Sequence, residues 1–298
     1  MKLRRVVVVY KKSSYQVYAR ERRDRRFLKL LRQKHGVVGR LVRSHRAHTE
    51  VLGHVRSVLR RRGIAVEFIY RAQGFSERKA DLVLTVGGDG TFLEASHSVI
   101  HRPILGINSN PEESVGFLCG TTARRLERIL DSIREDRLHP TELARLRVRM
   151  DKKVLPVQVL NDVLICHANP AATSRYIMQL RGIREEHKSS GVWISPPAGS
   201  TAATGAAGGR RLPIRSRAFQ FLVREIYHPT GKRFRLAGGI VRPGDSLVVF
   251  SKMRAGKIYL DGAHIHYPFS IGERLQISAT APPLLAFGLD GKRGRRRS

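Results

Sequence analysis

Hydrophobic and polar positions in roughly the first 140 residues follow two alternating patterns. Short apolar runs rich in β-branched residues are typical of buried strands, and they lie at 4–10, 63–70, 81–86 and 103–108. Between them apolar residues recur at helical spacing. The expected helices are two within 13–62, broken near Gly36–Gly39, one over 91–100 and one over 121–136. Strands alternating with helices predict an α/β domain with a parallel sheet.

The pattern changes after about residue 145. Short segments such as LRVRM, RYIMQLRG, DSLVVFS and RLQISATA are separated by turn residues, and some alternate apolar with polar positions. This predicts a β-rich C-terminal domain. We therefore expect an α/β domain at 1–145, a β-rich substrate-binding domain at 146–290 and a basic tail at 291–298. The longest apolar runs are far too short to cross a bilayer, so we expect no membrane partner.

The charge of the chain is unusual for a globular composition. Its 298 residues carry a formal net charge of +32, with 56 Lys and Arg against 24 Asp and Glu. Such a surface attracts polyanions, including nucleic acid, anionic lipid and phosphate-rich small molecules, but it does not distinguish among them. The basic stretch 20–34 lacks interleaved aromatic residues, which favours a solvated helix face over a nucleic-acid reader. Two cysteines and a short apolar N-terminal run predict a cytoplasmic protein.

The stretch GGDGT at 87–91 follows the apolar run ending at Val86 and carries candidate chemistry. Glycines let main-chain N–H groups approach an anion closely, and a helix beginning there adds N–H donors and a positive dipole end. A carboxylate repels phosphate, so Asp89 indicates a metal ligand or a base that takes a proton from an attacking hydroxyl. An Asp-Gly turn in which Asp89 merely caps a helix is the alternative.

Four further segments follow in order along the chain. They are LGINSNPEESVGFLCG (105–120), NDVLI (161–165), SGVWISPPAGSTAATGAAGG (190–209) and KIYLDG (257–262). With GGDGT, this set resembles the NAD kinase family in order and approximate spacing from about residue 80 to 287. GGDGT alone is shared with diacylglycerol and sphingosine kinases. The segment with glycine, serine and threonine is what points to NAD kinase.

The resemblance implies an activity and partners. Family enzymes have an α/β N-terminal and a β-rich C-terminal domain with the active site between them. They transfer the γ-phosphoryl group of ATP, or in some cases polyphosphate, to the adenosine ribose 2′-hydroxyl of NAD. They require a divalent metal such as Mg²⁺ and are commonly dimers or tetramers. We therefore expect NAD and ATP as partners and a homo-oligomer.

The resemblance also implies roles for individual residues. Asp89 would be the general base, and Gly87, Gly88, Gly90 and Thr91 would hold phosphate. Asn161 and Asp162 would hydrogen-bond NAD, Phe117 would form an apolar wall, and Ser200, Thr201, Ala202 and Ala206 would line the adenine and ribose pocket. Lys188 precedes this region and fits either a contact to a substrate phosphate or a solvated lysine. No metal-ligand set is expected, because His264 and His266 lack a third ligand.

Several positions depart from the family pattern. Asp162 replaces a glutamate, Ser190 replaces an aspartate expected near the nicotinamide, and Ala203 replaces a tyrosine. Ala198 lacks an expected hydroxyl, and Ala263 stands where a glutamine is common. These changes fall on acceptor recognition rather than on GGDGT. A catalytically weak dinucleotide-binding protein, or a kinase of a related nucleoside or lipid acceptor, remains an alternative.

Overall fold

The computed structural model describes residues 1–228 and 233–290, and its backbone divides into two units. The first unit comprises residues 1–141 and the chain from Leu284 onward, and the second comprises Glu142–Pro283. The boundary was expected at 145, and the return at Leu284 was not anticipated. Strand β17 (Arg274–Ala286) makes this return by running out of the second unit into the first. The predicted basic tail at 291–298 lies outside the described residues.

The first unit is built on a parallel sheet. Its strands are β1 (Arg5–Tyr10), β2 (Ala65–Tyr70), β3 (Leu82–Gly87), β4 (Ile104–Asn108) and β5 (Thr121–Thr122). They lie in the order β4-β3-β1-β2, and β5 and the last residue of β17 both pair with β4. All these pairings are parallel. Every residue of β3 is buried, as expected for a strand covered on both faces.

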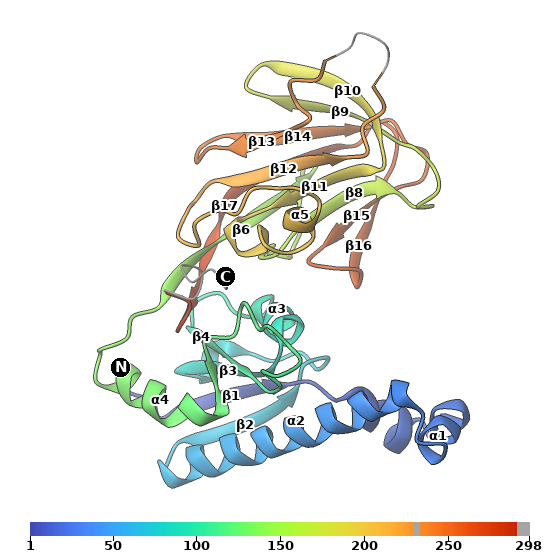
Figure 1. Ribbon diagram of the computed structural model, residues 1–298. Coiled ribbons are helices and arrows are strands. Elements are labelled where there is room, and N and C mark those ends of the chain that lie inside the picture. Colours follow the sequence, from blue (N-terminus) through green and yellow to red (C-terminus); the bar gives the residue numbers. More distant parts are fainter. Residues whose placement is uncertain (229–232, 291–298) are drawn as a thin grey trace. The chain divides into compact units, whose positions relative to one another are not determined.

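Helices cover both faces of this sheet (Figure 1). The helices of this unit are η1 (Gln16–Glu21), α1 (Arg25–Arg32), α2 (Gly36–Arg61), η2 (Glu77–Lys79), α3 (Asp89–Ser96), η3 (Ala123–Arg125) and α4 (Leu126–Arg134). Helix α1 lies at the end of α2, away from the sheet. Apolar residues of α2 and α4 pack with every second residue of β1 and β3, so these two helices share one face. Helix α3 contacts β3, β1 and β4 and does not contribute to that cluster. The predicted α/β class is confirmed.

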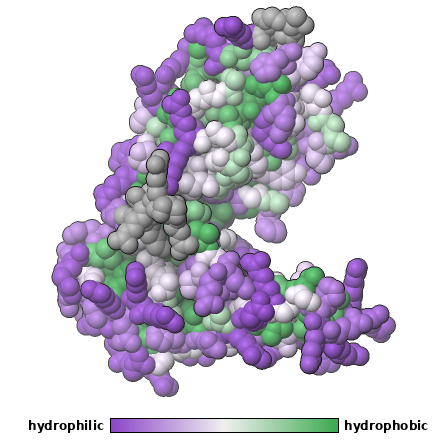
Figure 2. Space-filling view, in the orientation of Figure 1, coloured by the Kyte–Doolittle hydropathy of each residue, from purple (hydrophilic) through white to green (hydrophobic). Residues whose placement is uncertain are grey.

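The predicted helix break near Gly36–Gly39 is displaced. Helix α1 ends at Arg32 and α2 begins at Gly36, so Gly39 lies inside a helix. His35 caps α2, since its Nδ1 accepts a hydrogen bond from the Val37 N–H at 3.3 Å. A side-chain acceptor just before the helix therefore sets its start more strongly than the glycines do. Figure 2 shows hydrophilic side chains clustered over α1 and the adjoining part of α2.

The second unit contains two layers of mostly antiparallel strands, which confirms the β-rich prediction. One layer contains β6 (Thr141–Met150), β7 (Lys153–Val154), β9 (Ser174–Leu180), β10 (Ile183–Ser189), β14 (Ser246–Ser251) and most of β17. The other has the order β13 (Gly238–Val241), β12 (Phe219–Arg224), β11 (Gly191–Ser195), β8 (Val163–His167), β15 (Gly256–Leu260) and β16 (Ile265–Phe269). Both layers contribute buried residues to one core.

The strand register aligns the carboxyl ends of the first unit's sheet. Tyr10 at the end of β1 lies opposite both Tyr70 of β2 and Val86 of β3, and Gly87 lies opposite Asn108 of β4. The segments that follow these strands therefore start along one edge, where ligands collect in open parallel sheets. Among residues 1–228 and 233–290, no helix is both long and apolar enough to span a bilayer.

Candidate functional site

The Asp89 side chain is fixed by two backbone donors. Asp89 is the first residue of α3, directly after the last residues of β3 and the N-cap Gly88. Its Oδ2 accepts a hydrogen bond from the Phe117 N–H at 3.0 Å, and its Oδ1 accepts one from the Leu118 N–H at 2.7 Å. The carboxylate is thus oriented by the loop after β4, and each oxygen keeps a lone pair for a substrate hydroxyl.

A close approach explains why position 87 carries glycine. A Cβ at Gly87 would lie 2.2 Å from Oγ1 of Thr91, far inside van der Waals contact. Thr91 is buried in the first turn of α3, and its Oγ1 has no hydrogen-bond partner in the part of the chain that is described. The glycine therefore lets α3 begin directly against the end of β3.

Two cations that sequence reasoning missed lie beside the loop. Lys11 follows β1 and Arg71 follows β2, so both stand on the carboxyl edge of the sheet. Arg71 Nη1 lies 3.7 Å from the position that a Cβ on Gly90 would take, and its Nε pairs with Glu94 at 3.0 Å. Burial, with Arg71 as the second cause, lowers the pKa of Lys11. Their position directly after two strands of the parallel sheet could have identified both residues.

In the second unit, one carboxylate organises the NDVLI segment. Asp261 lies at the end of β15 with a φ of 52°, and it accepts hydrogen bonds from the Leu160, Asn161 and Asp162 N–H groups at 3.0, 2.7 and 3.1 Å. The Asn161 side-chain amide donates to Asp162 Oδ2. Asp261 stands in the KIYLDG motif, but its role depends on a partner about a hundred residues away and was not foreseen.

This arrangement buries one carboxylic acid next to another. Asp162 is only 5% exposed. Burial and, second, the charge of Asp261 raise the pKa of Asp162 to about 7, while the Asn161 amide opposes the shift. Asp162 therefore changes its charge near neutral pH.

The glycine of the AGST segment is required by its neighbour. Gly199 ends the short helix η4 (Pro197–Gly199), and a Cβ there would lie 1.5 Å from the Asn161 carbonyl oxygen. Ser200 is buried, donates to the Pro197 carbonyl at 2.7 Å and accepts from the Leu212 N–H at 3.1 Å. Thr201 and Ala202 are half-buried and lead into α5 (Ala203–Ala206). The segment thus sits directly against NDVLI.

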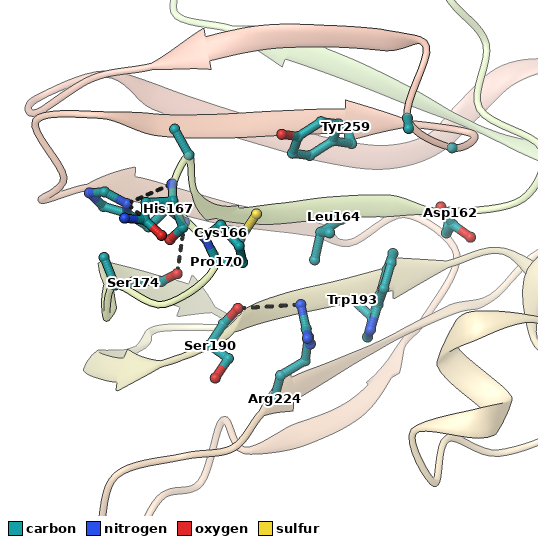
Figure 3. Close-up of a pocket in the computed structure, with 15 residues that line it drawn as sticks. Asp162, Leu164, Cys166, His167, Pro170, Ser174, Ser190, Trp193, Arg224 and Tyr259 are labelled. Carbon is teal, nitrogen blue, oxygen red and sulfur yellow. Dashed lines mark hydrogen bonds between the residues drawn. The ribbon is translucent and has the colours of Figure 1, made fainter.

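A cavity of about 460 Å³ adjoins these segments within the second unit. Its wall includes Asp162, Ser190 and Ala263, three of the positions that depart from the family pattern. Tyr259, Leu164 and Trp193 are successive cross-strand neighbours on β15, β8 and β11 and form its floor (Figure 3). These residues are absent from the buried core between the layers.

One cation stands beside this aromatic row. The Arg224 Cζ lies 5.6 Å from the ring centre of Trp193, and its Nη1 donates to the Ser190 carbonyl at 3.4 Å. This cation–π contact holds the guanidinium at the wall of the cavity. Burial raises the pKa of the Cys166 thiol, another lining residue. The cavity thus offers aromatic surface, one fixed positive charge and one titratable carboxyl.

Comparison with known proteins identifies the family. Residues 2–138 match the ATP-NAD kinase N-terminal domain. A probable NADH kinase from Oryza sativa subsp. japonica is 36% identical over 262 residues, covering 80% of this chain and 81% of its relative. An NADH kinase from Arabidopsis thaliana is 35% identical over 240 residues, covering 70% and 73%. The chain belongs to the NAD kinase family.

Solved NAD kinase structures share the fold. An Archaeoglobus fulgidus NAD kinase in complex with ATP superimposes with a TM-score of 0.69 at 20% identity, covering 96% of this chain and 94% of the other. A yeast NADH kinase complexed with NADH gives 0.66 at 15% identity, covering 100% and 89%. These likenesses show the fold. The family match and the rice and Arabidopsis relatives confirm the predicted family and enzyme class: the chain is a phosphotransferase of the NAD kinase type.

The candidate site residues expected from the resemblance fall into two groups. The first unit brings together Gly87, Gly88, Asp89, Gly90, Thr91 and the Phe117 backbone, although the Phe117 side chain is 42% exposed. The second unit brings Asn161 and Asp162 against the 196–206 segment, in which Ala206 is exposed. Lys188 is exposed on β10 and does not line the cavity. Among the described residues, no three His, Cys, Asp or Glu side chains gather as a metal site.

Proposed function

We propose that this protein transfers the γ-phosphoryl group of ATP to the adenosine ribose 2′-hydroxyl of NAD or NADH, with Asp89 as general base. The observation that carries the proposal is the Asp89 carboxylate, oriented by two backbone N–H groups at the carboxyl edge of a parallel sheet. The rice and Arabidopsis relatives, which are named NADH kinases, support NADH as an acceptor.

The transfer uses groups already placed at this edge. Asp89 takes the proton from the 2′-hydroxyl, whose oxygen bonds to the γ-phosphorus while the bond to the β–γ bridging oxygen breaks and ADP leaves. Lys11, Arg71 and the N–H groups of the glycine loop offset the negative charge of the transferring group. Positioning and charge stabilisation supply most of the acceleration in such reactions.

A divalent cation fits this reaction if it binds together with the phosphates of ATP. Asp89 is one carboxylate without two further clustered ligands in the described chain, and Mg²⁺ commonly binds through one or two carboxylates together with substrate phosphates. When bound, the ion supplies charge neutralisation on the phosphates. We infer that the donor phosphates would hold it, which leaves the Asp89 carboxylate available as the base.

The second unit provides acceptor recognition in this proposal. Asn161 and Asp162 hydrogen-bond the ribose, and the row formed by Tyr259, Leu164 and Trp193 receives a flat ring of the dinucleotide. Ser190 adds no negative charge to this cavity, whereas Arg224 adds a positive one. This balance suits an uncharged dihydronicotinamide, so NADH is the first acceptor to test.

The test is a product analysis. Purified protein is incubated with ATP and Mg²⁺ and, separately, NAD, NADH, adenosine and a diacylglycerol, and products are identified by mass spectrometry. Phosphorus NMR then locates the new phosphate. We expect NADP or NADPH with the phosphate at the 2′ position. Dinucleotide binding by calorimetry without product would instead identify a catalytically weak binding protein, and product from another acceptor would replace the proposed substrate.

The cellular context rests on the same reasoning. We infer a homo-oligomer, which light scattering on the purified protein tests directly.

A cytoplasmic location remains our prediction, and human NAD kinase 2, which is 36% identical over 124 residues, is named as mitochondrial. Fluorescence microscopy of the tagged chain distinguishes the two compartments.

A further inference from the structure

Helix α1 carries apolar side chains that belong to neither core. Half of its eight residues are apolar, yet none of its residues is buried. Among the described residues, neither apolar core includes Phe27, Leu28, Leu30 or Leu31. The main contacts of α1 are with η1 and with α2, at the end of α2 that lies away from the sheet (Figure 1). Packing within the first unit therefore accounts for these four residues only in part.

The cations of α1 lie opposite its apolar residues. With about 3.6 residues per turn, the four apolar positions fall on one side of the helix and four cations on the other, namely Arg25, Arg26, Lys29 and Arg32. All four cations are exposed, and within residues 1–228 and 233–290 none of them forms an ion pair within 4.0 Å. By the same geometry, Arg26 and Arg32 are the cations that flank the apolar side.

Acidic neighbours leave most of this charge uncompensated. Residues 20–34 contain eight Lys and Arg and two acidic residues, a net charge of +6. Glu21 pairs with Lys12 at 2.9 Å, and the Asp24 carboxylate accepts the Phe27 N–H at 2.7 Å as the cap of α1. A solvated helix face, expected for this stretch, accounts for its cations but not for its apolar residues.

Exposed apolar side chains also stand next to α1. Tyr18 is 40% exposed, and its ring centre lies 5.7 Å from that of Phe27. Val37, near the start of α2, is 66% exposed. The Arg22 Cζ lies 5.6 Å from the Tyr18 ring centre, so a further cation borders this surface. Figure 2 shows apolar surface among the hydrophilic side chains of this part of the molecule.

A bilayer surface accounts for both properties. Cations alone attract any polyanion, nucleic acid included. The phosphate backbone of a duplex offers no apolar contact to leucine and valine side chains, whereas the headgroup region of a bilayer receives apolar side chains and cations together. The cytoplasmic leaflet also carries anionic lipid, so its charge is complementary to that of α1.

We propose that α1, with Tyr18 and Val37, binds the surface of a bilayer that contains anionic phospholipid. The apolar side chains enter the headgroup region, while Arg26 and Arg32 stay at the lipid phosphates. Stable binding takes two signals, and this segment combines an apolar side with a basic patch. Binding at the surface needs no spanning segment, and only a spanning segment was excluded by the lengths of the apolar runs. The proposal does not depend on the proposed phosphoryl transfer.

Cosedimentation of the full chain with vesicles tests this proposal. Vesicles of phosphatidylcholine with about 30% phosphatidylserine are compared with vesicles of phosphatidylcholine alone, at about 0.15 M salt and without ATP or dinucleotide. One variant, Arg26→Gln/Arg32→Gln, removes two cations. The other, Tyr18→Gln/Val37→Gln, removes the two exposed apolar side chains and keeps the charge. Circular dichroism checks that every variant is folded.

Each variant has a matched control elsewhere in the chain. Arg60→Gln/Arg128→Gln removes two exposed arginines, one from the far end of α2 and one from α4. Val154→Gln/Ile271→Gln removes two apolar side chains of the second unit that are 42% and 65% exposed, nearly the same fractions as for the pair beside α1.

We expect the unsubstituted protein to bind anionic vesicles at least about tenfold more tightly than vesicles of phosphatidylcholine alone. Its partition coefficient on anionic vesicles should fall at least about tenfold in Arg26→Gln/Arg32→Gln, severalfold in Tyr18→Gln/Val37→Gln, and less than about twofold in both controls. Equal losses in the arginine variant and its control would reduce the effect to overall charge and overturn the proposal, as would no binding of the unsubstituted protein to anionic vesicles.

A parallel titration distinguishes a lipid surface from a nucleic-acid surface. Fluorescence anisotropy measures the binding of labelled duplex DNA to the same proteins at the same salt. Duplex binding that is lost in the arginine variant, together with vesicle binding that is unchanged in the apolar variant, would assign the surface to nucleic acid and overturn the proposal. If vesicle binding fails while NADP or NADPH is still formed, only this proposal fails; vesicle binding without any phosphorylated product leaves it standing and refutes the proposed function.

Discussion

Each unit places one aspartate at the centre of its candidate site, and the two environments differ. Asp89 is half-buried and accepts two backbone N–H groups from a neighbouring loop. Asp162 is almost fully buried beside a second carboxylate, and its pKa is raised to about 7. The first unit fixes the orientation of the Asp89 carboxylate. The second unit raises the pKa of Asp162, so that the charge of this carboxyl group changes near neutral pH.

This contrast separates two requirements of group transfer. A base must lie in a fixed direction toward a reacting hydroxyl, because geometry dominates its contribution. A residue that only binds the acceptor can be buried and partly neutral. The following changes test whether the two aspartates differ in this way.

The largest expected effect is that of Asp89→Asn on turnover. Loss of a general base lowers kcat about 100- to 10,000-fold. One of the two backbone donors would also face an amide N–H₂, which costs about 1–3 kcal/mol of local stability. Steady-state kinetics and thermal unfolding are measured on the same samples.

The control for this change is Glu67→Gln on β2, an exposed carboxylate outside the site. It should leave both quantities unchanged. If Asp89→Asn keeps more than about a tenth of the turnover, Asp89 is not the base. Asp162→Asn should mainly raise the KM for the dinucleotide, and a loss of kcat as large as that of Asp89→Asn would remove the contrast between the two units.

The next prediction compares the loss of folding stability when one glycine in each unit is replaced by alanine. In Gly199→Ala the new Cβ would meet a backbone carbonyl at 1.5 Å, so the chain itself must move. In Gly87→Ala it would meet the Thr91 side chain at 2.2 Å, part of which can rotate away. We expect losses of about 3 kcal/mol or more for Gly199→Ala and about 1–3 kcal/mol for Gly87→Ala.

Urea unfolding measures these differences. Trp193 is the only tryptophan in the chain and lies in the second unit, so its fluorescence follows that unit for Gly199→Ala. Circular dichroism follows Gly87→Ala. Gly74→Ala is the control, because nothing lies within 4 Å of its Cβ position. A Gly199→Ala protein as stable as this control would contradict the close packing of the 196–206 segment on NDVLI.

Local pattern predicted the first unit's site better than the second's. GGDGT stands at the end of a fully buried strand, so its place on the sheet edge followed from the run before it. Lys11 and Arg71 followed from the same rule but were overlooked, because single cations after strands are common. The candidate phosphate-binding loop of the first unit is therefore encoded mostly by neighbours in sequence.

The second unit depends on contacts that no local pattern contains. The charge state of Asp162 is set by Asp261, which approaches only because a tight turn follows β15. The aromatic row requires knowing that β15, β8 and β11 are adjacent, although they are far apart in sequence. The class of this unit was predictable from alternating segments, but strand order and register were not.

A smaller effect follows from the raised pKa of Asp162. Between about pH 4 and pH 7 the folded chain keeps a proton that the unfolded chain loses, so this group's contribution to stability falls as pH rises through that window. The loss is on the order of a few kcal/mol and persists above pH 7. Asp162→Asn should remove it and make the second unit more stable at pH 8.

Trp193 fluorescence during urea unfolding at pH 5 and pH 8 measures this dependence. Asp151→Asn, an exposed aspartate in the same unit, is the control and should keep the pH dependence of the unsubstituted protein. If the Asp162→Asn variant shows the same pH dependence of stability as the unsubstituted protein, the buried carboxyl group does not titrate near neutral pH. The KM for the dinucleotide should also fall between pH 6 and pH 8, because the carboxylate accepts hydrogen bonds from ribose hydroxyls.

The smallest effect has the opposite direction and belongs to the first unit. His48 on α2 is buried, and its Nε2 is 2.8 Å from the Lys11 carbonyl. Burial lowers the pKa of His48 to about 4. The hydrogen bond to the Lys11 carbonyl opposes this shift, and the charges of Lys11 and His45 add to it. Between about pH 6.5 and pH 4 only the unfolded chain is protonated there, so this unit loses stability as pH falls through that window. Burial of a neutral histidine thus has the opposite pH dependence to burial of a protonated aspartate.

His48→Gln should reduce this acid sensitivity, because a glutamine amide can donate to the Lys11 carbonyl without titrating. Cys119 is fully buried in the first unit, so the rate at which a thiol reagent labels it in a Cys166→Ser background reports the opening of that unit. After correction for intrinsic thiol reactivity, labelling should accelerate about tenfold between pH 7 and pH 5, and less in His48→Gln. Equal acceleration with and without His48 would leave acid sensitivity to other groups and would remove this half of the contrast between the units.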